Sequence, residues 1–560
     1  MYRFFVLMCF ILLGEFGFAQ EKSPGFVSPV DHQIRLTGNF MELRPNHFHA
    51  GIDIKSTNGQ SGDVIRNVFK GHISRIKVQS GSYGNALYID HPNGYTSVYA
   101  HLQDFNDEIA AYVKDIQYSI ESFEVDIYLP DTLFPLEQKT AIGTMGNTGR
   151  SFGPHLHFEL RDTKSEHPVN PELLGIGPED TSAPKLESLH FHLLGKQGEV
   201  IKKEVKYFNP NYKNYQLYKD TIKLNAQKIG CGMQMFDRMD GSWNKNGIYS
   251  YKLLVDDSLE FSWRADEFSF EESKYINGFW DFERKEEHGQ KVYLFYRSEC
   301  NSFSFYNSKG DGIIELSNSQ ARKVNILVSD LHGNESECEF HLIADKVSET
   351  ITMESAVQDC DTIQVLRAGY FEVILDENSL FTPATIAVEY TKENISGMTC
   401  PSITIGNSRI PVKNRYRLST RIPEEDIEKW TMVKRANNGK LKQFGGDTLG
   451  GRFVCLLDEL GIFSLYKDTT PPTIRPVSFS SEFKTPWKIE IKDNLVADGL
   501  ARDLYYKATI NGEWIRMRYD AKNNMLLFDD ADKLPDGMKY LDLTVIDHCG
   551  NVASYNRKIK

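Results

Sequence analysis

Two short motifs place histidine and aspartate side chains at spacings that suit a catalytic metal site. The motif HxGxD holds His49 and Asp53, and HLHFE, later in the chain, holds His155 and His157. A hydrolytic zinc site usually takes three protein ligands of the His and Asp/Glu type and leaves a fourth position for water. His49, Asp53 and one of the later histidines could supply that set. Zn²⁺ would then lower the pKa of water to about 7 and polarise the carbonyl under attack.

The residues around the second motif are typical of a turn that leads into a strand. Side chains at positions i and i+2 of a strand project from the same face, so His155 and His157 are expected to point together. Asn147, Gly149 and Gly153, which precede them, are turn-forming residues. We therefore expect the histidine pair to emerge from a tight, polar loop.

Four blocks of sequence connect these motifs to a known family. Residues 40–160 resemble the lysostaphin/LytM-type zinc metallopeptidases, which cut peptides in bacterial cell walls. The blocks occur in the same order as in that family: FHAGIDIK with His49 and Asp53, SGSYGNALYIDHPNGYTSVYAHL ending at His101, AIGTMGNTGRSFG, and PHLHFELRD with His155 and His157.

The resemblance implies a role for each of these side chains. It assigns one Zn²⁺ per chain to His49, Asp53 and His157, and it assigns catalytic roles to His101 and His155, which would polarise the water and stabilise the tetrahedral intermediate. No ligand of the set is missing, and this favours an enzyme over a relative that only binds and regulates. The resemblance also implies a compact antiparallel sheet with the zinc in a groove across it.

Other histidines are predicted to be structural. His47 lies two residues before His49, and His91 lies beside the turn-forming Pro92-Asn93-Gly94. A second HxH, His190 and His192 in LHFHLL, lacks the preceding turn and an HxGxD partner, so it is predicted to belong to a strand.

One segment of the peptidase-like region is longer than a simple turn. Residues 103–139 are rich in charge, and their half from Asp107 to Glu121 is predicted to be helical. This segment could line or cover a substrate groove.

The N-terminal residues predict export. Residues 1–19 combine a basic Arg3, an apolar run and a small-residue exit near Ala19, as in a signal peptide. No later stretch is long and apolar enough for a transmembrane helix. We expect the mature protein in the periplasm or cell envelope of a Gram-negative bacterium. The formal charge of -13 and a pI near 5.7 argue against binding to nucleic acid.

The cysteines and tryptophans lie mostly beyond the peptidase-like region. Seven cysteines follow the signal segment, the first of them Cys231. The zinc site therefore cannot use thiolate, and export makes one to three disulfides plausible, with the pairing open. Tryptophans are usually core residues, but exposed ones could also stack on sugars or on a partner: Trp263, Trp280, Trp430, Trp487 and Trp514.

The whole chain is predicted to be mainly β. After the signal peptide we expect a lysostaphin/LytM-like domain (20–178), a β-sandwich module (179–346), a β-rich module (347–467) and an immunoglobulin-like β-sandwich (468–560). Strands and turns alternate through the last three. An internal echo supports two related modules: DTSAPKLESLHF from Asp180 resembles DTTPPTIRPVSF from Asp468, and VNILVSDLHGN resembles LDLTVIDHCGN.

These observations predict a secreted zinc metalloendopeptidase that hydrolyses peptidoglycan stem peptides or cross-links, with the β modules as spacers or localisation elements. An alternative is an envelope scaffold, adhesin or regulator whose β modules bind envelope proteins, with the peptidase domain autoinhibited. A secreted peptidase for proteins outside the wall is a further alternative. The groove walls that would choose the bond lie on loops, so the sequence leaves the specificity open.

Overall fold

The computed structural model describes residues 25–211, 215–308, 310–345, 360–423, 425–436, 438–479, 486–497, 504–530, 533–534 and 537–559. The predicted signal peptide, residues 1–19, lies outside these residues. None of the described helices combines the length and the apolar character needed to cross a membrane.

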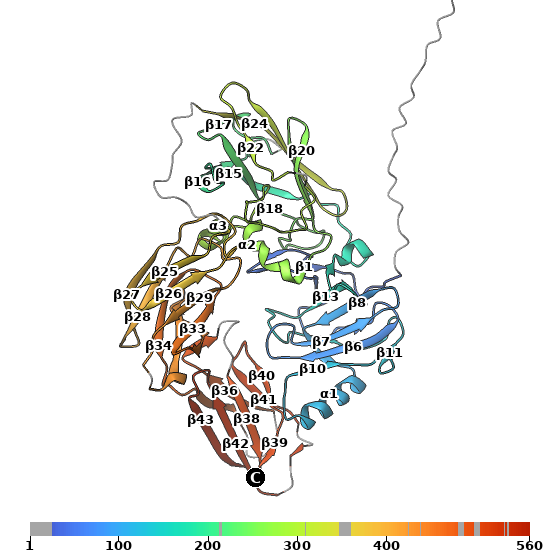
Figure 1. The fold of residues 1–560 in the computed structure, drawn as a ribbon. Helices are drawn as coiled ribbons and strands as arrows, with labels where there is room; N and C mark the ends of the chain where they lie inside the picture. Colours follow the sequence, from blue (N-terminus) through green and yellow to red (C-terminus); the bar gives the residue numbers. More distant parts are fainter. Residues whose placement is uncertain are drawn as a thin grey trace, which may run out of the picture.

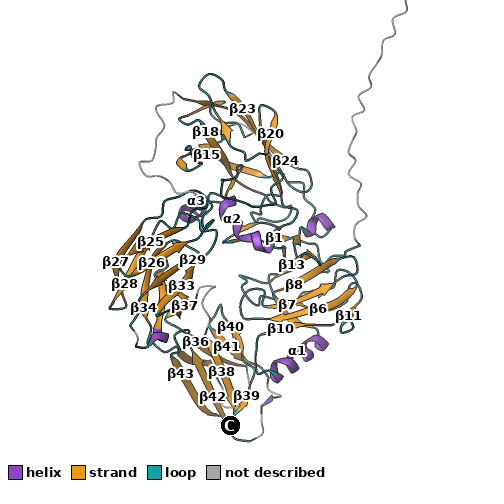
Figure 2. Cartoon of the chain, viewed as in Figure 1, coloured by secondary structure: helices purple, strands orange, loops and turns teal. Residues whose placement is uncertain are grey.

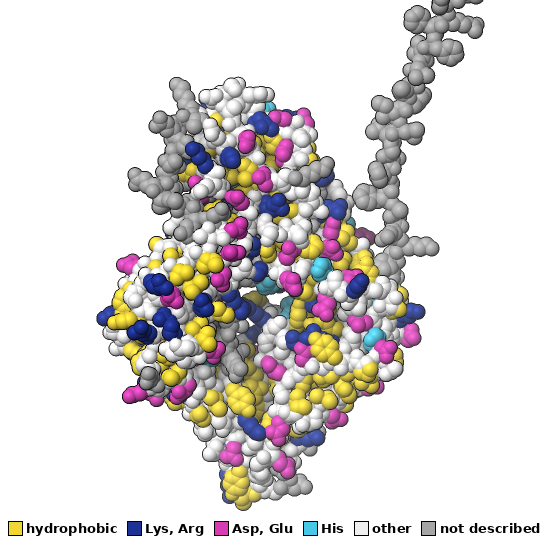
Figure 3. Space-filling view, viewed as in Figure 1, with side chains coloured by type: hydrophobic (Ala, Val, Ile, Leu, Met, Phe, Trp, Pro, Cys, Tyr) yellow, Lys and Arg dark blue, Asp and Glu magenta, His cyan; other side chains and the backbone are white. Residues whose placement is uncertain are grey.

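The chain is mainly β, as predicted, and its helices are few and short (Figure 2). For description we use the predicted ranges: the peptidase-like region (25–178), the first β module (179–345), the middle β module (360–467) and the C-terminal β module (468–559). In Figure 1 these four regions follow one another around a ring, and the C-terminal β module returns to helix α1. The space-filling view shows an opening at the centre of the ring (Figure 3).

The peptidase-like region is built on a nine-stranded sheet in the order β1-β4-β13-β8-β7-β6-β10, with β11 and β14 at its sides. A three-stranded sheet (β5-β12-β9) and the hairpin β2-β3 accompany it. The elements are β1 (Leu36–Gly38), β2 (Leu43–Arg44), β3 (His47–Phe48), β4 (Ile52–Lys55), β5 (Val64–Arg66), β6 (Gly71–Val78), β7 (Asn85–Asp90), β8 (Tyr95–Ala100), β9 (Leu102–Phe105), α1 (Asp107–Ser119), β10 (Val125–Tyr128), β11 (Pro135–Leu136), β12 (Ala141–Met145), β13 (His155–Asp162), β14 (Pro168–Val169) and the 3₁₀ helix η1 (Pro171–Leu174).

Helix α1 confirms the helical half predicted within residues 103–139. It begins after Asn106, whose side chain accepts a hydrogen bond from the backbone N–H of Ile109. Asp107 and Glu108 in the first turn suit the positive end of the helix dipole. Ile109 and Val113, one turn apart, are buried and fix the helix against the sheets.

The first β module contains two five-stranded sheets, β16-β15-β18-β21 with β22, and β17-β24-β23-β19-β20. Its elements are β15 (Lys185–Leu194), β16 (Val200–Tyr207), β17 (Thr221–Leu224), β18 (Lys228–Phe236), β19 (Ser250–Val255), β20 (Ser258–Arg264), η2 (Phe270–Tyr275), α2 (Ile276–Phe279), α3 (Phe282–His288), β21 (Val292–Leu294), β22 (Ile314–Glu315), β23 (Arg322–Ser329) and β24 (Glu335–Ala344).

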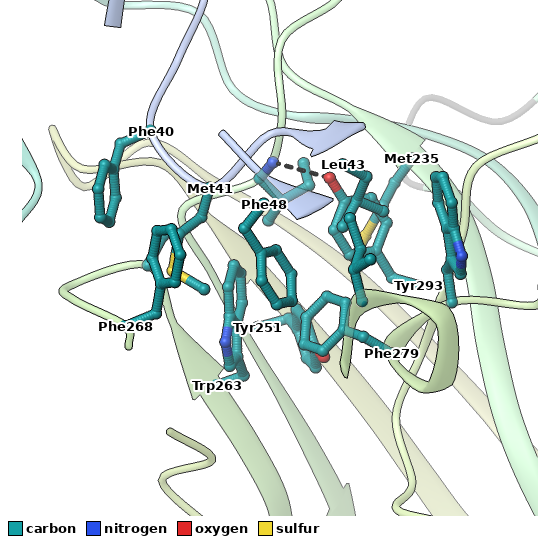
Figure 4. Close-up of a cluster of buried hydrophobic side chains, with 14 of the residues drawn as sticks. Phe40, Met41, Leu43, Phe48, Met235, Tyr251, Trp263, Phe268, Phe279 and Tyr293 are labelled. Atoms are coloured by element: carbon teal, nitrogen blue, oxygen red, sulfur yellow. Dashed lines mark hydrogen bonds between the residues drawn. The ribbon is translucent and has the colours of Figure 1, made fainter. Parts of the chain in front are cut away.

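The peptidase-like region and the first β module share one hydrophobic core. A single cluster of buried side chains runs from Val30 to Ala344. Phe48, on β3, lies in this cluster among Phe279, Tyr251 and Trp263 of the first β module (Figure 4). The first β module therefore supplies part of the hydrophobic core on which the peptidase-like region folds.

The middle and C-terminal β modules each place two sheets around a core of their own. The middle module has β25 (Gln364–Ala368), β26 (Phe371–Leu375), β27 (Val388–Ile395), β28 (Met398–Ile405), β29 (Tyr416–Thr420), η3 (Ile427–Lys429), β30 (Trp430–Arg435), β31 (Leu441–Gly445), β32 (Asp447–Leu449), β33 (Arg452–Leu457) and β34 (Gly461–Lys467). The C-terminal module has β35 (Thr473–Ser478), β36 (Trp487–Lys492), β37 (Leu495–Ala497), β38 (Tyr505–Ile510), β39 (Glu513–Trp514), β40 (Arg518–Asp520), β41 (Met525–Phe528), β42 (Lys539–Ile546) and β43 (Val552–Ile559).

A disulfide between Cys300 and Cys360 links the first and middle β modules covalently.

The five tryptophans that could bind sugars or a partner differ in their exposure. Trp263, Trp280 and Trp487 are buried core residues. Trp430 and Trp514 are partly exposed and line a cavity of about 1310 Å³ between the C-terminal module, the middle module and the chain just after α1.

Candidate metal centre

Three strands of the large sheet position the predicted site. Strand β13 lies between β4 and β8, and the register pairs His157 of β13 with Asp53 of β4 on one side and with Ala100 of β8 on the other. His101 directly follows Ala100, and His155 lies two residues before His157 on β13. The sequence motifs are thus brought together because they lie on neighbouring antiparallel strands.

The side chains of His49, Asp53 and His157 converge. Nε2 of His49 lies 3.0 Å from Oδ1 of Asp53 and 3.0 Å from Nδ1 of His157, and the last two atoms are 2.9 Å apart. All three residues are buried. These side chains form a group able to hold a metal ion.

The converging atoms fit the zinc ion that the sequence predicts. Two imidazole nitrogens and one carboxylate oxygen are donor types found in catalytic zinc sites, and ligands about 2.0 Å from a tetrahedral zinc lie about 3.3 Å apart. The observed separations are a few tenths of an ångström shorter, so a small outward movement lets the three atoms bind one ion.

Hydrogen bonds at the opposite ring nitrogens orient the two histidine ligands. Nδ1 of His49 lies 2.7 Å from the carbonyl oxygen of Asn39, to which it donates when Nε2 carries the lone pair. Nε2 of His157 lies 2.8 Å from Oε1 of Glu159 and donates to it. Such partners fix the tautomer and raise the basicity of the ligating nitrogen.

Glu159 is itself held by two further side chains. It is fully buried, accepts a hydrogen bond of 2.5 Å from the Tyr83 hydroxyl, and forms an ion pair with Arg161 at 2.6 Å. Although burial alone would raise its pKa, Arg161, His157 and Tyr83 lower the pKa of Glu159 to about 2. Because the carboxylate stays charged, it remains a strong acceptor of the hydrogen bond from Nε2 of His157.

The electrostatics of the cluster suit a cation. Burial lowers the pKa of His49, although Asp53 acts in the opposite direction. For His157 the effect of burial is outweighed by hydrogen bonds to Asp53 and Glu159, which raise its pKa to about 9. The surrounding histidines hold the pKa of Asp53 well below its usual range despite its burial. An anionic carboxylate beside histidines that can exchange a proton for a metal ion is the setting that metal binding requires.

His101 and His155 lie beside the cluster. Their ring centroids are 4.9 Å apart, and Nε2 of His155 lies 3.4 Å from Oδ1 of Asp53. Nδ1 of His101 faces the carbonyl oxygen of Thr148 at 2.8 Å, and Nδ1 of His155 faces that of Gly153 at 2.8 Å. These contacts leave Nε2 of His101 available for the reaction and turn Nε2 of His155 toward Asp53.

The backbone at His101 is unusual for a non-glycine residue. Its φ of 60° lies in the left-handed region, which costs an L-amino acid energy and is often found at functional sites. Burial, together with the nearby His157 and His155, lowers the pKa of His101 to about 3. His101 is therefore neutral at ordinary pH.

Sequence reasoning missed two residues that contact the cluster. Nη2 of Arg44 lies 2.5 Å from Oδ2 of Asp53, so this carboxylate faces the histidines with one oxygen and the guanidinium with the other. Glu159 could have been found, because it is two residues after His157 and shares its strand face. Arg44 has no comparable signal, since a hairpin turn separates it from the motif.

The histidines predicted to be structural lie outside the cluster. His47 is exposed, and its Nδ1 faces the Pro45 carbonyl oxygen at 2.8 Å. His91 lies between β7 and β8 and pairs with Ser97 at 2.7 Å. His190 and His192 lie on β15, which confirms that this HxH belongs to a strand.

Comparisons with known proteins match part of this chain. The family model described as "Peptidase family M23" matches residues 47–117, which include His49, Asp53 and His101. The DD-carboxypeptidase/endopeptidase Mpg of Neisseria meningitidis serogroup B is 36% identical over 138 residues, 24% of this chain and 25% of the relative. The protein of that name from Neisseria gonorrhoeae gives the same values. The predicted family resemblance is confirmed for this region, and the chain spans about a quarter of the length of these curated relatives.

Two solved structures are also similar to part of the chain. A zinc containing peptidase from Vibrio cholerae is 22% identical, with a TM-score of 0.19, over 28% of this chain and 41% of that one. The catalytic domain of lysostaphin from Staphylococcus simulans is 20% identical, with a TM-score of 0.17, over 24% of this chain and 89% of that one.

Proposed function

We propose that this chain, whose residues 47–117 match peptidase family M23, is an exported zinc metalloendopeptidase that hydrolyses peptide bonds in peptidoglycan. The proposal rests above all on the convergence of His49, Asp53 and His157 within 3.0 Å of one another. The similarity to Mpg, a DD-carboxypeptidase/endopeptidase, supports wall peptides as the substrate class.

The side chains around the cluster have distinct parts in such a reaction. Zinc, when bound, supplies Lewis acidity toward the scissile carbonyl and makes water a stronger acid. Neutral His101 can accept a proton at Nε2, because its Nδ1 is engaged by the Thr148 carbonyl. His155, whose Nδ1 faces the Gly153 carbonyl, can donate a hydrogen bond from Nε2 toward developing negative charge when its ring is in the imidazolium form. Glu159 and Asn39 keep the two histidine ligands oriented.

The first experiment is a comparison of zinc content and hydrolysis in matched histidine variants. His157→Ala should lose bound zinc, measured by mass spectrometry of the metal, and should release no peptides from purified peptidoglycan. His101→Ala should keep its zinc and lose about 10²- to 10⁴-fold in rate, as expected for removal of a general acid–base group. His47→Ala, next to the site but outside the cluster, is the control and should match the wild type.

The released fragments identify the class of substrate. Chelator-sensitive cleavage of cross-linked wall peptides supports the proposal, whereas cleavage of glycine-rich or unfolded proteins alone would favour a peptidase for substrates outside the wall. Wild-type hydrolysis by His157→Ala would show that the site assignment is wrong.

A second candidate is a gated enzyme whose C-terminal β module restrains the peptidase-like region. Lys522 of that module donates hydrogen bonds to the backbone and side-chain oxygens of Asn147, in the loop that leads to His155. The Tyr118 ring of α1 packs edge-to-face against Trp514, with centroids 5.2 Å apart. The Tyr118 hydroxyl also donates to Asp530 at 3.1 Å. These contacts close the ring in Figure 1, where the C-terminal β module meets α1.

Loosening this contact tests the gate. If the C-terminal module restrains access, Lys522→Ala should raise the rate of peptidoglycan hydrolysis while zinc content stays unchanged. Lys488→Ala, at an exposed lysine of the same module, is the control. An equal or lower rate for Lys522→Ala, with unchanged zinc, would remove the gated candidate and leave a constitutive enzyme.

A further inference from the structure

Two clusters of acidic side chains lie at equivalent positions in the first and C-terminal β modules. Asp180 and Asp468 each precede the first strand of their module, and Asp330 and Asp547 each follow a late strand, β23 or β42. Asp180 and Asp468 begin one pair of the similar sequence segments, and Asp330 and Asp547 lie within the other pair. Neither cluster is part of the candidate metal centre.

The two clusters have the same internal hydrogen bonds. In the first, Asn334 donates from its backbone to Oδ1 of Asp330 at 2.8 Å and from Nδ2 to Oδ2 at 2.7 Å. Nδ2 of Asn334 also lies 3.2 Å from the carbonyl oxygen of Asp180.

In the C-terminal module, Asn551 makes the same contacts. It donates to Oδ1 and Oδ2 of Asp547 at 2.8 Å each, and its Nδ2 lies 3.2 Å from the carbonyl oxygen of Asp468. An asparagine thus holds one aspartate in place beside another in both modules.

One carboxylate oxygen in each cluster is buried without a partner. Oδ1 of Asp180 accepts hydrogen bonds from the backbone of Ser182 and Asp240, but its Oδ2 accepts none, and Asp180 is 7% exposed. Asp468 is 0% exposed and repeats this arrangement, since its Oδ1 accepts from Thr470 while its Oδ2 has no hydrogen-bond partner. A buried, unpartnered carboxylate oxygen is costly unless a cation binds it.

The potential ligand atoms in each cluster lie close enough to share one ion. Asp180, Asp330 and His332 offer atoms within 4.8 Å of one another. So do Asp468, Asp493 and Asp547, and Oδ1 of Asp493 is a second buried atom without a partner.

Further acidic groups surround the first cluster. Asp237 and Glu172 line the same small cavity, of about 10 Å³, as Asp180, Asp330 and His332. That is room for one water or one ion. Burial and the neighbouring carboxylates raise the pKa of Asp237 to about 7 and that of Glu172 to about 8.

Positive charge near the clusters is sparse. Within the described part of the chain, no lysine or arginine forms an ion pair with Asp180, Asp330, Asp468 or Asp547. Near the second cluster, Lys429 donates to the Cys549 carbonyl at 2.9 Å and to Oδ1 of Asn551 at 2.8 Å, rather than to a carboxylate of the cluster. The negative charge of both clusters is therefore only partly compensated by the protein.

We propose that these two clusters are Ca²⁺ sites, one in the first β module and one in the C-terminal β module. Ca²⁺ takes hard oxygen ligands, which the carboxylates of both clusters supply. At the first site the lining carboxylates Asp237 and Glu172 can take the place of the His332 nitrogen, which is not a ligand type that Ca²⁺ prefers. Mg²⁺ fits less well because it requires near-ideal octahedral geometry and keeps most of its water. The proposal goes beyond the peptidase activity and does not depend on it.

The positions of the sites indicate what bound calcium does. Each lies at a junction, since Asp180 follows the peptidase-like region and Asp468 follows the last strand of the middle β module. The first cavity is also lined by Asn39, whose carbonyl oxygen faces His49 at 2.7 Å. Calcium at the first site therefore fixes the segment that orients a candidate zinc ligand.

The test is calcium binding by the full mature chain, measured by equilibrium dialysis and metal mass spectrometry with zinc counted separately. The wild type should bind two Ca²⁺, with dissociation constants of about 10⁻⁴ to 10⁻³ M, as in other extracellular modules. Its melting temperature should rise in millimolar CaCl₂. Asp180→Asn and Asp468→Asn should each bind one Ca²⁺, because asparagine keeps the Oδ1 acceptor and replaces only the unpartnered oxygen.

Stability without calcium separates a metal site from a merely structural role. In calcium-free buffer both variants should be at least as stable as the wild type, because each removes one repelling charge. The controls are Asp257→Asn and Asp542→Asn, at exposed positions of the same modules, and both should bind two Ca²⁺. The proposal is overturned if the wild type binds no Ca²⁺ at millimolar concentration, if the two variants still bind two ions, or if Mg²⁺ binds more tightly.

Discussion

Phe48, the residue before His49, packs its ring edge-to-face against Phe279 of the first β module, with ring centroids 5.4 Å apart. The side chain of Phe48 also contacts Phe303 and Phe268, at centroid distances of 5.5 and 5.7 Å. A candidate metal ligand is thus attached to the core of the neighbouring module through the adjacent side chain. The peptidase-like region depends on that module for the position of His49.

Phe48→Ala should therefore weaken both the fold and the metal site. Removal of a buried phenylalanine costs about 3–5 kcal/mol, and the released β3 strand should no longer hold His49 in place. Denaturant unfolding and a zinc competition titration measure the two effects. Tyr128→Ala, at a 72% exposed aromatic residue on β10, is the control. Wild-type zinc affinity in a folded Phe48→Ala protein would show that the packing does not position the ligand.

Glu159→Gln should lower zinc affinity without removing a ligand. The carboxylate accepts a hydrogen bond from Nε2 of His157. A glutamine is a weaker acceptor, and it also removes the buried carboxylate that pairs with Arg161. Loss of such an outer partner typically costs about 10- to 100-fold in metal affinity. The measurement is titration with a chromogenic chelator. Glu166→Gln, at an exposed site after β13, should keep wild-type affinity, and an unchanged affinity in Glu159→Gln would contradict the proposed role.

His190 should make stability depend on pH. Burial, and then the nearby His192 and Arg284, lower the pKa of His190 from its ordinary value of 6.5 to about 4. Between these pH values the unfolded chain binds the proton and the folded protein does not, so the free energy of unfolding falls as pH decreases. The full loss is about 3 kcal/mol per chain, from the size of the shift.

His190→Gln tests this by removing the titrating group. Denaturant unfolding at several pH values between 7.5 and 4.5 should show a smaller loss of stability on acidification for the variant than for the wild type. His288→Gln, at a histidine with a 49% exposed side chain, should follow the wild type. Parallel curves for wild type and His190→Gln would mean that His190 is not the source of the pH dependence.

Much of the candidate site could be predicted because its histidines lie in short motifs with local strand and turn signals. The period-two pattern placed His155 and His157 on one face, and turn residues placed them after a loop. The helix from Asp107 was also readable, because a capping residue and a short amphipathic pattern are local signals. Local sequence therefore predicted the parts of the site that depend on local structure.

What the sequence did not show depends on contacts between distant segments. Nothing near Phe48 indicated that its ring would enter the core of another module, and nothing near Lys522 indicated a contact with Asn147. The sequence allows Trp263 and Trp487 to be core or binding residues, and the structure buries both in the core. Such contacts are set by tertiary packing, which local patterns do not encode.

We expect Phe152 to contact substrate, because it lies between two residues that contact His155. The residues on both sides of it support the site, since Ser151 Oγ lies 3.3 Å from Nδ1 of His155 and the Gly153 carbonyl lies 2.8 Å from the same atom. The Phe152 side chain itself is fully exposed. An exposed aromatic side chain beside a reaction centre gains free energy when a bound peptide covers it.

Phe152→Ala should therefore weaken substrate binding and leave the chemistry intact. Loss of the buried area of one phenylalanine is worth about 1.5–3 kcal/mol, or roughly 10- to 100-fold in KM, with kcat and zinc content unchanged. Steady-state kinetics on soluble cross-linked wall peptides, with the exposed Tyr128→Ala as control, measures this. A fall in kcat at constant KM would instead mean that the ring contacts the substrate only in the transition state. Unchanged kinetics would mean that the substrate binds on another side of the loop.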